Sequence, residues 1–192
     1  MLPPMSSELT GPGGAASPLD SIELRDGRET DAAAIEAVHF ASREAVYRGR
    51  VFDWPPLGPD RAGRIALWRA WLSSPEIEAV VAVDAGVIVG FCTVRRSMDD
   101  DARKETAEMP TLYVHPDHWR RGVGQALCSA GLDRALAMGC DELTLWVLEM
   151  NEEARRFYSA FGFTEEPATK VDEGTRERLV ARRYHIALPV AP

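Results

Sequence analysis

The segment that decides how the rest of the chain is organised is Val114-His115-Pro116-Asp117-His118-Trp119-Arg120-Arg121-Gly122-Val123-Gly124-Gln125-Ala126-Leu127. An apolar run ends at a proline and leads through a short turn into a helical pattern. Helix starts leave backbone N–H groups without partners and carry the positive end of the helix dipole, so they attract anions. Gly122 and Gly124 remove the side chains that would keep a phosphate from that backbone, and Arg120 and Arg121 add positive charge. Most arginine pairs are solvated surface charge, but the Gly-x-Gly at a helix start favours a phosphate-binding cradle here.

Length and composition narrow the class of protein. The 192 residues suffice for one ordinary domain that needs no metal or disulfide. The 22 basic and 30 acidic residues give a net charge of −8, which disfavours a general nucleic-acid or anionic-membrane binder because both surfaces are polyanions. Cys92, Cys128 and Cys140 are odd in number, lie in apolar runs and form no C-x-x-C, which argues against a disulfide framework. With neither a secretory leader nor an apolar span of about 18 residues in view, we expect a cytoplasmic protein.

The first third of the chain predicts a tail, a strand and two helices. Residues 1–20 are rich in proline, glycine and serine, so we expect them to be disordered. Residues 22–25 alternate apolar and charged side chains, as a short strand does, and Thr30 is expected to cap the first helix. A proline-rich loop at 49–59 separates it from a second helix at about 60–73, and residues 51–59 of this loop are a candidate lid over a substrate. The residues expected on the buried faces are Ile35, Val38, Ala41 and Ala45 in the first helix and Ile65, Trp68 and Leu72 in the second.

The remaining two thirds predict a mixed α/β sheet. Two β-rich runs flank Asp84-Ala85-Gly86, which indicates an antiparallel hairpin. The run Asp99–Asp101 lies in a charged loop that is most simply solvated, although three carboxylates could also draw in a cationic amine. The other expected elements are a strand at 106–114, a helix from Gly122 to Met138 ended by Gly139, a strand at 143–148, a helix capped by Asn151 and ended by Gly162, and strands from Phe163 and over 180–188.

Two sequence blocks in this order resemble the GNAT superfamily of acetyl-CoA-dependent N-acyltransferases. The family's phosphate motif, which is Gln or Arg, two residues, Gly, one residue, and Gly or Ala, matches residues 119–124, with Trp119 at the position of the Gln or Arg. The family's later motif is matched by Asn151, Ala154, Phe157-Tyr158 and Gly162-Phe163. A lone R-G-x-G would be weak evidence, but both blocks at a separation suited to one helix and one strand are strong.

The resemblance implies a fold, a domain and a cofactor site. The fold would be a mixed, mostly antiparallel sheet of about six to seven strands with a V-shaped splay, flanked by about four helices. The N-acetyltransferase domain would cover residues 21–188, and acetyl-CoA would be the co-substrate, with no metal. The residues that would bind the cofactor are Leu112, Tyr113, Val114, Arg120, Arg121, Gly122, Val123, Gly124, Gln125, Asn151 and Tyr158.

The chemistry of acetyl transfer assigns further roles. A primary amine of lysine-like pKa is free base in only about 1 molecule in 2,500 at pH 7, so attack on a thioester needs a base. Tyr158 can donate a proton to the leaving thiolate, and the resemblance makes it the general acid. Backbone N–H groups at the end of the strand 111–114 would meet the oxyanion. Some relatives carry a Glu base where Trp146 stands here, which leaves Glu108, Glu149 or a water chain, and we favour Glu108. No cysteine is suitably placed as a nucleophile, so direct transfer in a ternary complex is expected.

Other functions remain open from the sequence. The main alternative is a non-catalytic acyl-CoA sensor, although retention of Tyr158 and Asn151 favours the enzyme. A Walker-type nucleotide site lacks its Lys-Ser or Lys-Thr after the glycines. The H-x-x-H of His115 and His118 has no third ligand nearby in the sequence, which argues against a metal. The acceptor is expected to be a small-molecule amine or a peptide amine; its identity, the oligomeric state and acetyl versus a longer acyl group are not specified by the sequence, although homodimers are common among similar proteins.

Overall fold

A seven-stranded sheet forms the centre of the computed structural model, which describes residues 21–50, 59–172 and 178–189. The strands are β1 (Ile22–Asp26), β2 (Glu78–Asp84), β3 (Val87–Arg96), β4 (Thr106–Val114), β5 (Glu142–Leu148), β6 (Thr164–Asp172) and β7 (Leu179–Ala187). They lie in the order β1-β2-β3-β4-β5-β7-β6, and every neighbouring pair is antiparallel except β4 and β5. The predicted mixed, mostly antiparallel sheet is therefore confirmed, as is the hairpin, whose turn holds Ala85 and Gly86 at positive φ.

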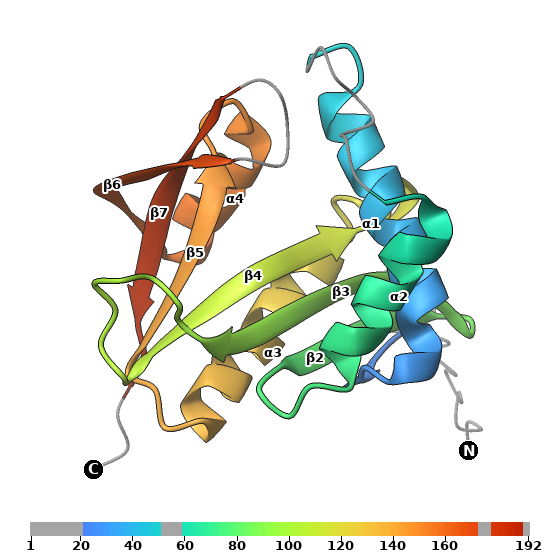
Figure 1. The fold of residues 1–192 in the computed structure, drawn as a ribbon, viewed down its shortest axis with the longest axis horizontal. Coiled ribbons are helices and arrows are strands. Elements are labelled where there is room, and N and C mark those ends of the chain that lie inside the picture. The colour runs from blue at the N-terminus through green and yellow to red at the C-terminus, as the bar shows by residue number, and fades with distance from the viewer. Residues whose placement is uncertain (1–20, 51–58, 173–177, 190–192) are drawn as a thin grey trace, which may run out of the picture.

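Within the described residues, four α-helices and two short 3-10 helices flank the sheet. They are η1 (Glu29–Asp31), α1 (Ala32–Tyr47), α2 (Arg61–Leu72), η2 (Pro116–His118), α3 (Val123–Ala137) and α4 (Glu152–Phe161). Figure 1 shows α1 and α2 on one face of the sheet, over β2 to β4, with α3 on the other face and α4 beside β5 and β7. The core is divided accordingly, because one cluster with Leu127 and Leu143 lies on the α3 side and a smaller one with Ile35 and Trp68 lies under α1 and α2.

The predicted V-shaped splay lies between β4 and β5. These strands pair only where Thr106–Glu108 meets Glu142–Thr144, so the rest of β4 has an open edge toward β5. Figure 1 shows the two strands diverging from that short contact. The register between β3 and β4 also shifts, since Thr93 lies opposite Thr111 but Arg95 lies opposite Glu108. This irregularity falls at Pro110, which has no N–H to give to a ladder.

Two predictions about α1 are wrong. Thr30 lies inside η1 and does not cap the helix; Asp31 precedes it, and its carboxylate accepts the N–H of Arg28 at 2.8 Å and the guanidinium of Arg25. Ala45 is exposed and Ser42 is buried in its place, because the inward face of α1 runs from Ile35 through residue 38 to 42. The expected disordered tail and most of the proline-rich loop, including Trp54, lie outside the described residues.

Candidate active site

The turn before α3 has the geometry of an anion cradle. Arg120 has φ 59 and Gly122 has φ 83, so two residues of this turn lie in the left-handed region, a feature of backbone turns that bind anions. Among the residues that the structure describes, the first amide of this segment that finds a backbone acceptor is that of Ala126, which donates to the carbonyl of Gly122 at 3.0 Å. The N–H groups of residues 123–125 are therefore available to an anion at the positive end of a 15-residue helix.

A cavity of about 630 Å³ connects this cradle to the open edge of β4. The residues that line it are Ser42, Arg43, Val46, Tyr47, Leu112, Tyr113, Val114, His118, Trp119, Arg120, Gly122, Gly124, Gln125, Asn151, Glu153, Ala154, Arg156, Phe157 and Tyr158. Nine of the eleven predicted cofactor-binding residues are in this set. The other two, Arg121 and Val123, do not line the cavity; Arg121 is exposed, and the Val123 side chain is 1% exposed in the core, so only its amide can serve the cradle.

The open edge of β4 offers fewer backbone groups than predicted. The amide of His115 donates to Val89 of β3, so the alternation along a strand turns the polar groups of Leu112 and Val114 toward β5 and those of Tyr113 toward β3. The carbonyl of Val114 is already occupied, because the indole N–H of Trp119 donates to it at 2.7 Å. Trp119 thus fixes the end of β4, and the N–H of Val114 and both groups of Leu112 remain for a ligand.

Tyr158 stands where its hydroxyl can meet a ligand. The residue is 8% exposed, packs against Phe157 and Phe163, and lines the cavity. Its hydroxyl has no hydrogen-bond partner among the described residues. Burial raises the pKa of Tyr158 well above its usual value, which keeps the phenol protonated. A protonated, unpartnered hydroxyl in a cavity has the properties of a proton donor.

Asn151 caps α4, as the sequence predicts. Its Oδ1 accepts the amide of Ala154 at 3.2 Å, and Gly162 ends the helix at φ 118. The amide Nδ2 of Asn151 has no partner in the described part of the chain, and the residue lines the cavity. Capping uses only the oxygen, so the nitrogen remains available to a ligand.

The largest group of lining residues that sequence reasoning missed comes from α1. These residues are Ser42, Arg43, Val46 and Tyr47. Their helical pattern indicates which of them face inward, but not that the last two turns of α1 extend past the sheet and over the splay. Arg156 and Phe157 of α4 were likewise missed as lining residues, although they neighbour Tyr158 in the quoted motif.

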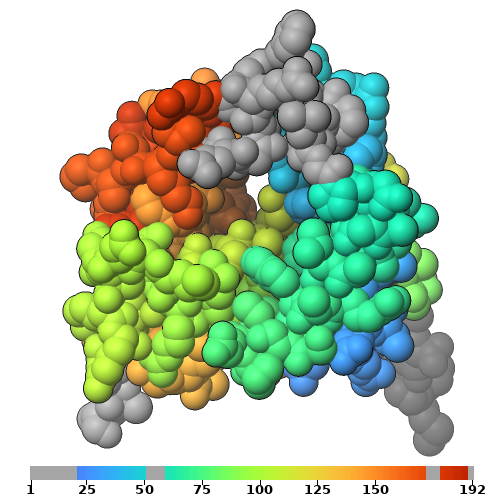
Figure 2. Space-filling model, in the orientation of Figure 1, coloured from blue at the N-terminus to red at the C-terminus, as the bar shows by residue number. Residues whose placement is uncertain are grey.

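Glu108 lies on the opposite face of the sheet, at the base of the splay. Glu108 is 5% exposed. Its Oε2 accepts two hydrogen bonds from Arg95, from Nε at 3.3 Å and from Nη2 at 3.1 Å. The Arg95 guanidinium lies 5.6 Å from the ring centre of Trp71 of α2. Figure 2 shows this face hollowed between α2 and the arm formed by β5 to β7, with β4 at the bottom.

Glu149, the other carboxylate considered as a base, faces a different environment. Its Oε1 accepts two hydrogen bonds from Arg182 of β7, and its side chain is 46% exposed. Neither Glu149 nor Glu108 is among the residues that line the cavity. Glu108 lies where β4 pairs with β5, at the base of the splay, whereas Glu149 follows the far end of β5.

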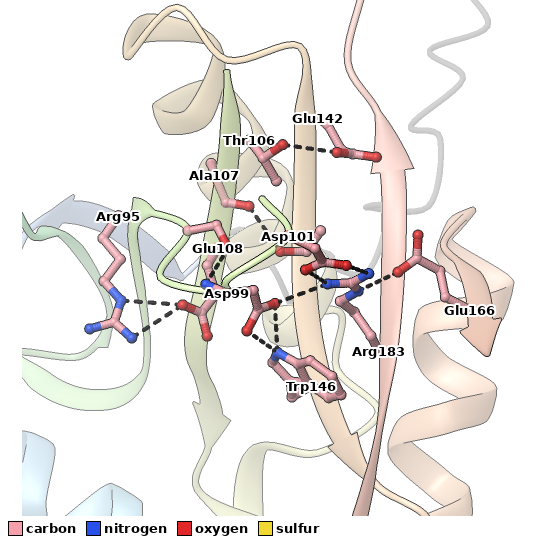
Figure 3. Close-up of polar contacts among 12 residues, drawn as sticks. Arg95, Asp99, Asp101, Thr106, Ala107, Glu108, Glu142, Trp146, Glu166 and Arg183 are labelled. Carbon is pink, nitrogen blue, oxygen red and sulfur yellow. Dashed lines mark hydrogen bonds and ion pairs between the residues drawn. The ribbon is translucent and has the colours of Figure 1, made fainter. Parts of the chain in front are cut away.

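The loop between β3 and β4 is anchored instead of being solvated throughout, which corrects one of the two interpretations of its aspartates. Asp99 accepts the indole N–H of Trp146, at 3.2 and 3.1 Å to its two oxygens, and lies 3.4 Å from Nη1 of Arg183. Arg183 also makes two hydrogen bonds to Asp101, at 2.6 and 2.7 Å, and one to Glu166 of β6. Figure 3 shows these groups joining the loop to β5, β6 and β7. The side chain of Asp99 is 17% exposed.

The cysteines and histidines show no sign of nucleophilic or metal chemistry in the described residues. All three cysteines are buried, and burial raises the pKa of Cys92 and of Cys128 to about 12. Nε2 of His118 lies 3.2 Å from Oδ2 of Asp84. Within the described ranges, no group of three His, Cys, Asp or Glu side chains is placed to hold a metal ion. No described helix is both long and apolar enough to cross a membrane.

A cavity that joins an anion cradle to a splayed strand edge and a protonated tyrosine defines an acyl-CoA-dependent transferase, and comparison with known proteins agrees. The model of the Acetyltransferase (GNAT) family matches residues 43–163. The chain therefore belongs to the GNAT acetyltransferase family, in which acetyl-CoA is the co-substrate.

Individual relatives act on different acceptors. The L-amino acid N-acyltransferase MnaT of Escherichia coli is 25% identical over 142 residues, which are 74% of this chain and 79% of that protein. A mycothiol acetyltransferase of Sanguibacter keddieii is 34% identical over 170 residues, which cover 85% of this chain but only 50% of that protein. A GCN5-related N-acetyltransferase from Kribbella flavida is 26% identical with a TM-score of 0.66, covering 88% of this chain and 99% of that one.

Proposed function

We propose that this chain transfers an acetyl group from acetyl-CoA directly to a primary amine within a ternary complex. The observation that carries the proposal is the arrangement of unpartnered polar groups around one cavity. The hydroxyl of Tyr158, the amide nitrogen of Asn151 and the amides at the start of α3 all lack partners among the described residues and belong to this site. Polar groups that line one cavity and make no hydrogen bond within the described protein are available to a ligand.

The cradle would hold the pyrophosphate of coenzyme A on the amides of residues 123–125, with Arg120 beside it. The open edge of β4 would take the amides of the pantetheine arm, through Leu112 and the N–H of Val114. Asn151 would bind the same arm with its nitrogen. These contacts bring the thioester to the splay, next to Tyr158 and the backbone amides that would stabilise its oxyanion.

The chemical step would use one group on each side of the sheet. The amine nitrogen attacks the thioester carbonyl, a C–N bond forms and the C–S bond breaks. Glu108 takes the proton that the amine sheds, either directly or through water, and Tyr158 gives its proton to the departing thiolate sulfur. The raised pKa of Tyr158 favours this donation because its phenol is still protonated at the pH of the reaction.

The test is a thiol-release assay over polyamines, amino acids, aminoglycosides and peptides, followed by variants on the best acceptor. We expect Tyr158→Phe to lower kcat by about 10²- to 10⁴-fold, a much larger effect than its effect on acetyl-CoA affinity. Glu108→Gln should lower kcat/KM and change its pH profile. Glu149→Gln is the matched control and should leave both unchanged. An unchanged pH profile in Glu108→Gln would contradict the assignment of the base, and no thiol release with any amine would contradict the transferase.

A further inference from the structure

The Arg95–Glu108 ion pair points to the chemical class of the acceptor. We propose that the acceptor is an α-amino acid with a free carboxylate, and that Arg95 binds this carboxylate while Glu108 holds the neighbouring ammonium group. The inference rests on the proposed transferase function and makes its acceptor more specific. It assigns to Arg95 a recognition role that the acetyl transfer itself does not require.

The ion pair uses only part of what each partner offers. Both hydrogen bonds from Arg95 converge on the same oxygen of Glu108, Oε2. Oε1 of Glu108 and Nη1 of Arg95 therefore have no partner among the residues that the structure describes. An ammonium group can approach Oε1 of Glu108, and a carboxylate can approach Nη1 of Arg95. An α-amino acid presents both groups together, because its ammonium and its carboxylate are bonded to the same carbon.

Burial makes the pairing of charges important. The side chain of Glu108 is 7% exposed and that of Arg95 is 23% exposed, beneath Trp71. A simple amine that docks as a cation on Glu108 shares that carboxylate with Arg95, and a partly buried guanidinium whose charge is poorly compensated is unfavourable. A zwitterion adds no net charge and gives Arg95 a second carboxylate, so it is favoured over an amine of the same shape.

A second arginine on the same face, Arg183, has a structural role and differs from Arg95 in its hydrogen bonds. Arg183 contacts three carboxylates, those of Asp99, Asp101 and Glu166, and its side chain is 14% exposed. Its hydrogen bonds involve Nε, Nη1 and Nη2. Figure 3 shows this saturated cluster beside β5 and β7, and the simpler Arg95–Glu108 pair beside β3 and β4. Arg95, unlike Arg183, leaves one guanidinium nitrogen without a partner among the described residues.

The experiment compares matched acceptors that differ only at the carboxyl group. L-Alanine, L-leucine, L-phenylalanine and L-glutamine are each supplied as the free acid, the amide and the decarboxylated amine, and thiol release is measured. We expect kcat/KM to be about 10- to 100-fold higher for the preferred free acid than for its amide, the range of a charge-assisted hydrogen bond. Arg95→Gln should abolish that preference by raising KM for the acid alone. Arg95→Lys should keep part of it, because the charge remains but the fork is lost.

Arg183→Gln is the control and should change the ratio of acid to amide by less than about threefold, whatever it does to stability. Equal use of acid and amide by the unaltered protein would overturn the inference while leaving the transferase intact. So would an Arg95→Gln variant that loses acid and amide activity equally, since that outcome shows a structural role. If no amine is acetylated, calorimetry on the CoA-loaded protein decides: tighter binding of acid than amide supports Arg95, and equal or absent binding overturns the inference.

Discussion

Replacing Glu36 with alanine should destabilise the wall of α1 and α2 that borders the acceptor side. Glu36 is 1% exposed, yet its carboxylate receives the indole N–H of Trp68 at 3.1 Å and the guanidinium of Arg64, both from α2. His39 lies 3.7 Å away and packs edge-on against Trp68 and against Tyr113 of β4. The buried carboxylate of Glu36 therefore joins α1 to α2. Its partners Arg64 and Trp68 follow it by 28 and 32 residues in the sequence.

The magnitude follows from what the substitution leaves behind. The Trp68 N–H would be buried without a partner, which costs about 1–3 kcal/mol. Losing one member of a buried ion pair costs about 3–5 kcal/mol, but the side chain of Arg64 is 32% exposed and can turn to water, which reduces that amount. We expect Glu36→Ala to lower the free energy of unfolding by about 3 kcal/mol, a fall in Tm of about 6–12 °C for a chain of this size.

The same carboxylate predicts a pH dependence. Burial opposes ionisation of Glu36, but hydrogen bonds from His39 and Arg64 outweigh it and lower its pKa below the ordinary 4.5. Burial likewise lowers the pKa of His39 below 6.5. A lowered pKa in the folded state contributes stability above the ordinary value and loses it as pH falls through the folded value. Stability should therefore decline below pH 6.5, first through His39, and Glu36→Gln should make the decline below pH 4.5 shallower.

Urea unfolding followed by tryptophan fluorescence measures both effects. Glu44→Ala is the matched control in the same helix, because Glu44 pairs with Arg48 at the surface, and it should cost only about 0.5 kcal/mol. A loss below about 1 kcal/mol in Glu36→Ala would refute the reasoning, as would the same acid limb in the Glu36→Gln variant and the unaltered protein.

Three further predictions concern the cofactor side. A Cβ on Gly124 would lie 3.6 Å from the ring of Phe157, which is an ordinary contact. Gly124→Ala should therefore weaken acetyl-CoA binding by less than about tenfold in calorimetry, whereas Gly124→Glu should abolish it. Equal effects of the two substitutions would contradict the cradle. Trp119→Phe removes the donor to the Val114 carbonyl and should raise the acetyl-CoA Kd by about 3- to 10-fold, while Trp119→Gln keeps a donor and should change it little. Because burial raises the pKa of Tyr158, kcat should stay level from about pH 8 to pH 10, and a fall with a pKa near 10 would show that this phenol is not buried during turnover.

The sequence predicts the cradle and α4 well because their determinants are local. A glycine in the left-handed region, a helix start and an Asn cap with a glycine stop each depend on a few adjacent residues, and Gly122, Asn151 and Gly162 all lie where expected. The pairing of β4 with β5 is different in kind. The pairing is short because β4 and β5, which are distant in sequence, diverge after three residues. The sequence indicated this divergence only through its resemblance to the motifs of the GNAT superfamily.

Contacts between distant segments account for the predictions that failed. Asp99 was interpreted as a solvated or substrate-attracting group because its neighbours in sequence are acidic, but its partners, Trp146 and Arg183, lie 47 and 84 residues away. Glu36 was not singled out from the sequence, and its two donors come from α2. Thr30 lost the cap position because Asp31 pairs with Arg25 and Arg28. No local pattern reports such partners, so polar residues with long-range partners are the weakest part of a prediction from sequence.

The hydrogen-bonding state of each polar group then separates structural from ligand-binding roles among residues of the same type. Arg183, Glu36 and Asp99 are buried or nearly so, and each has several partners within the fold. By contrast, Tyr158 lacks a partner for its hydroxyl, and Arg95 lacks one for Nη1, within the described residues. Polar atoms around the splay that make no hydrogen bond within the described protein are the ones that substrate atoms can complete. On that ground the acceptor should offer a carboxylate as well as an amine, and the comparison of acid with amide tests whether the open donor of Arg95 serves that purpose.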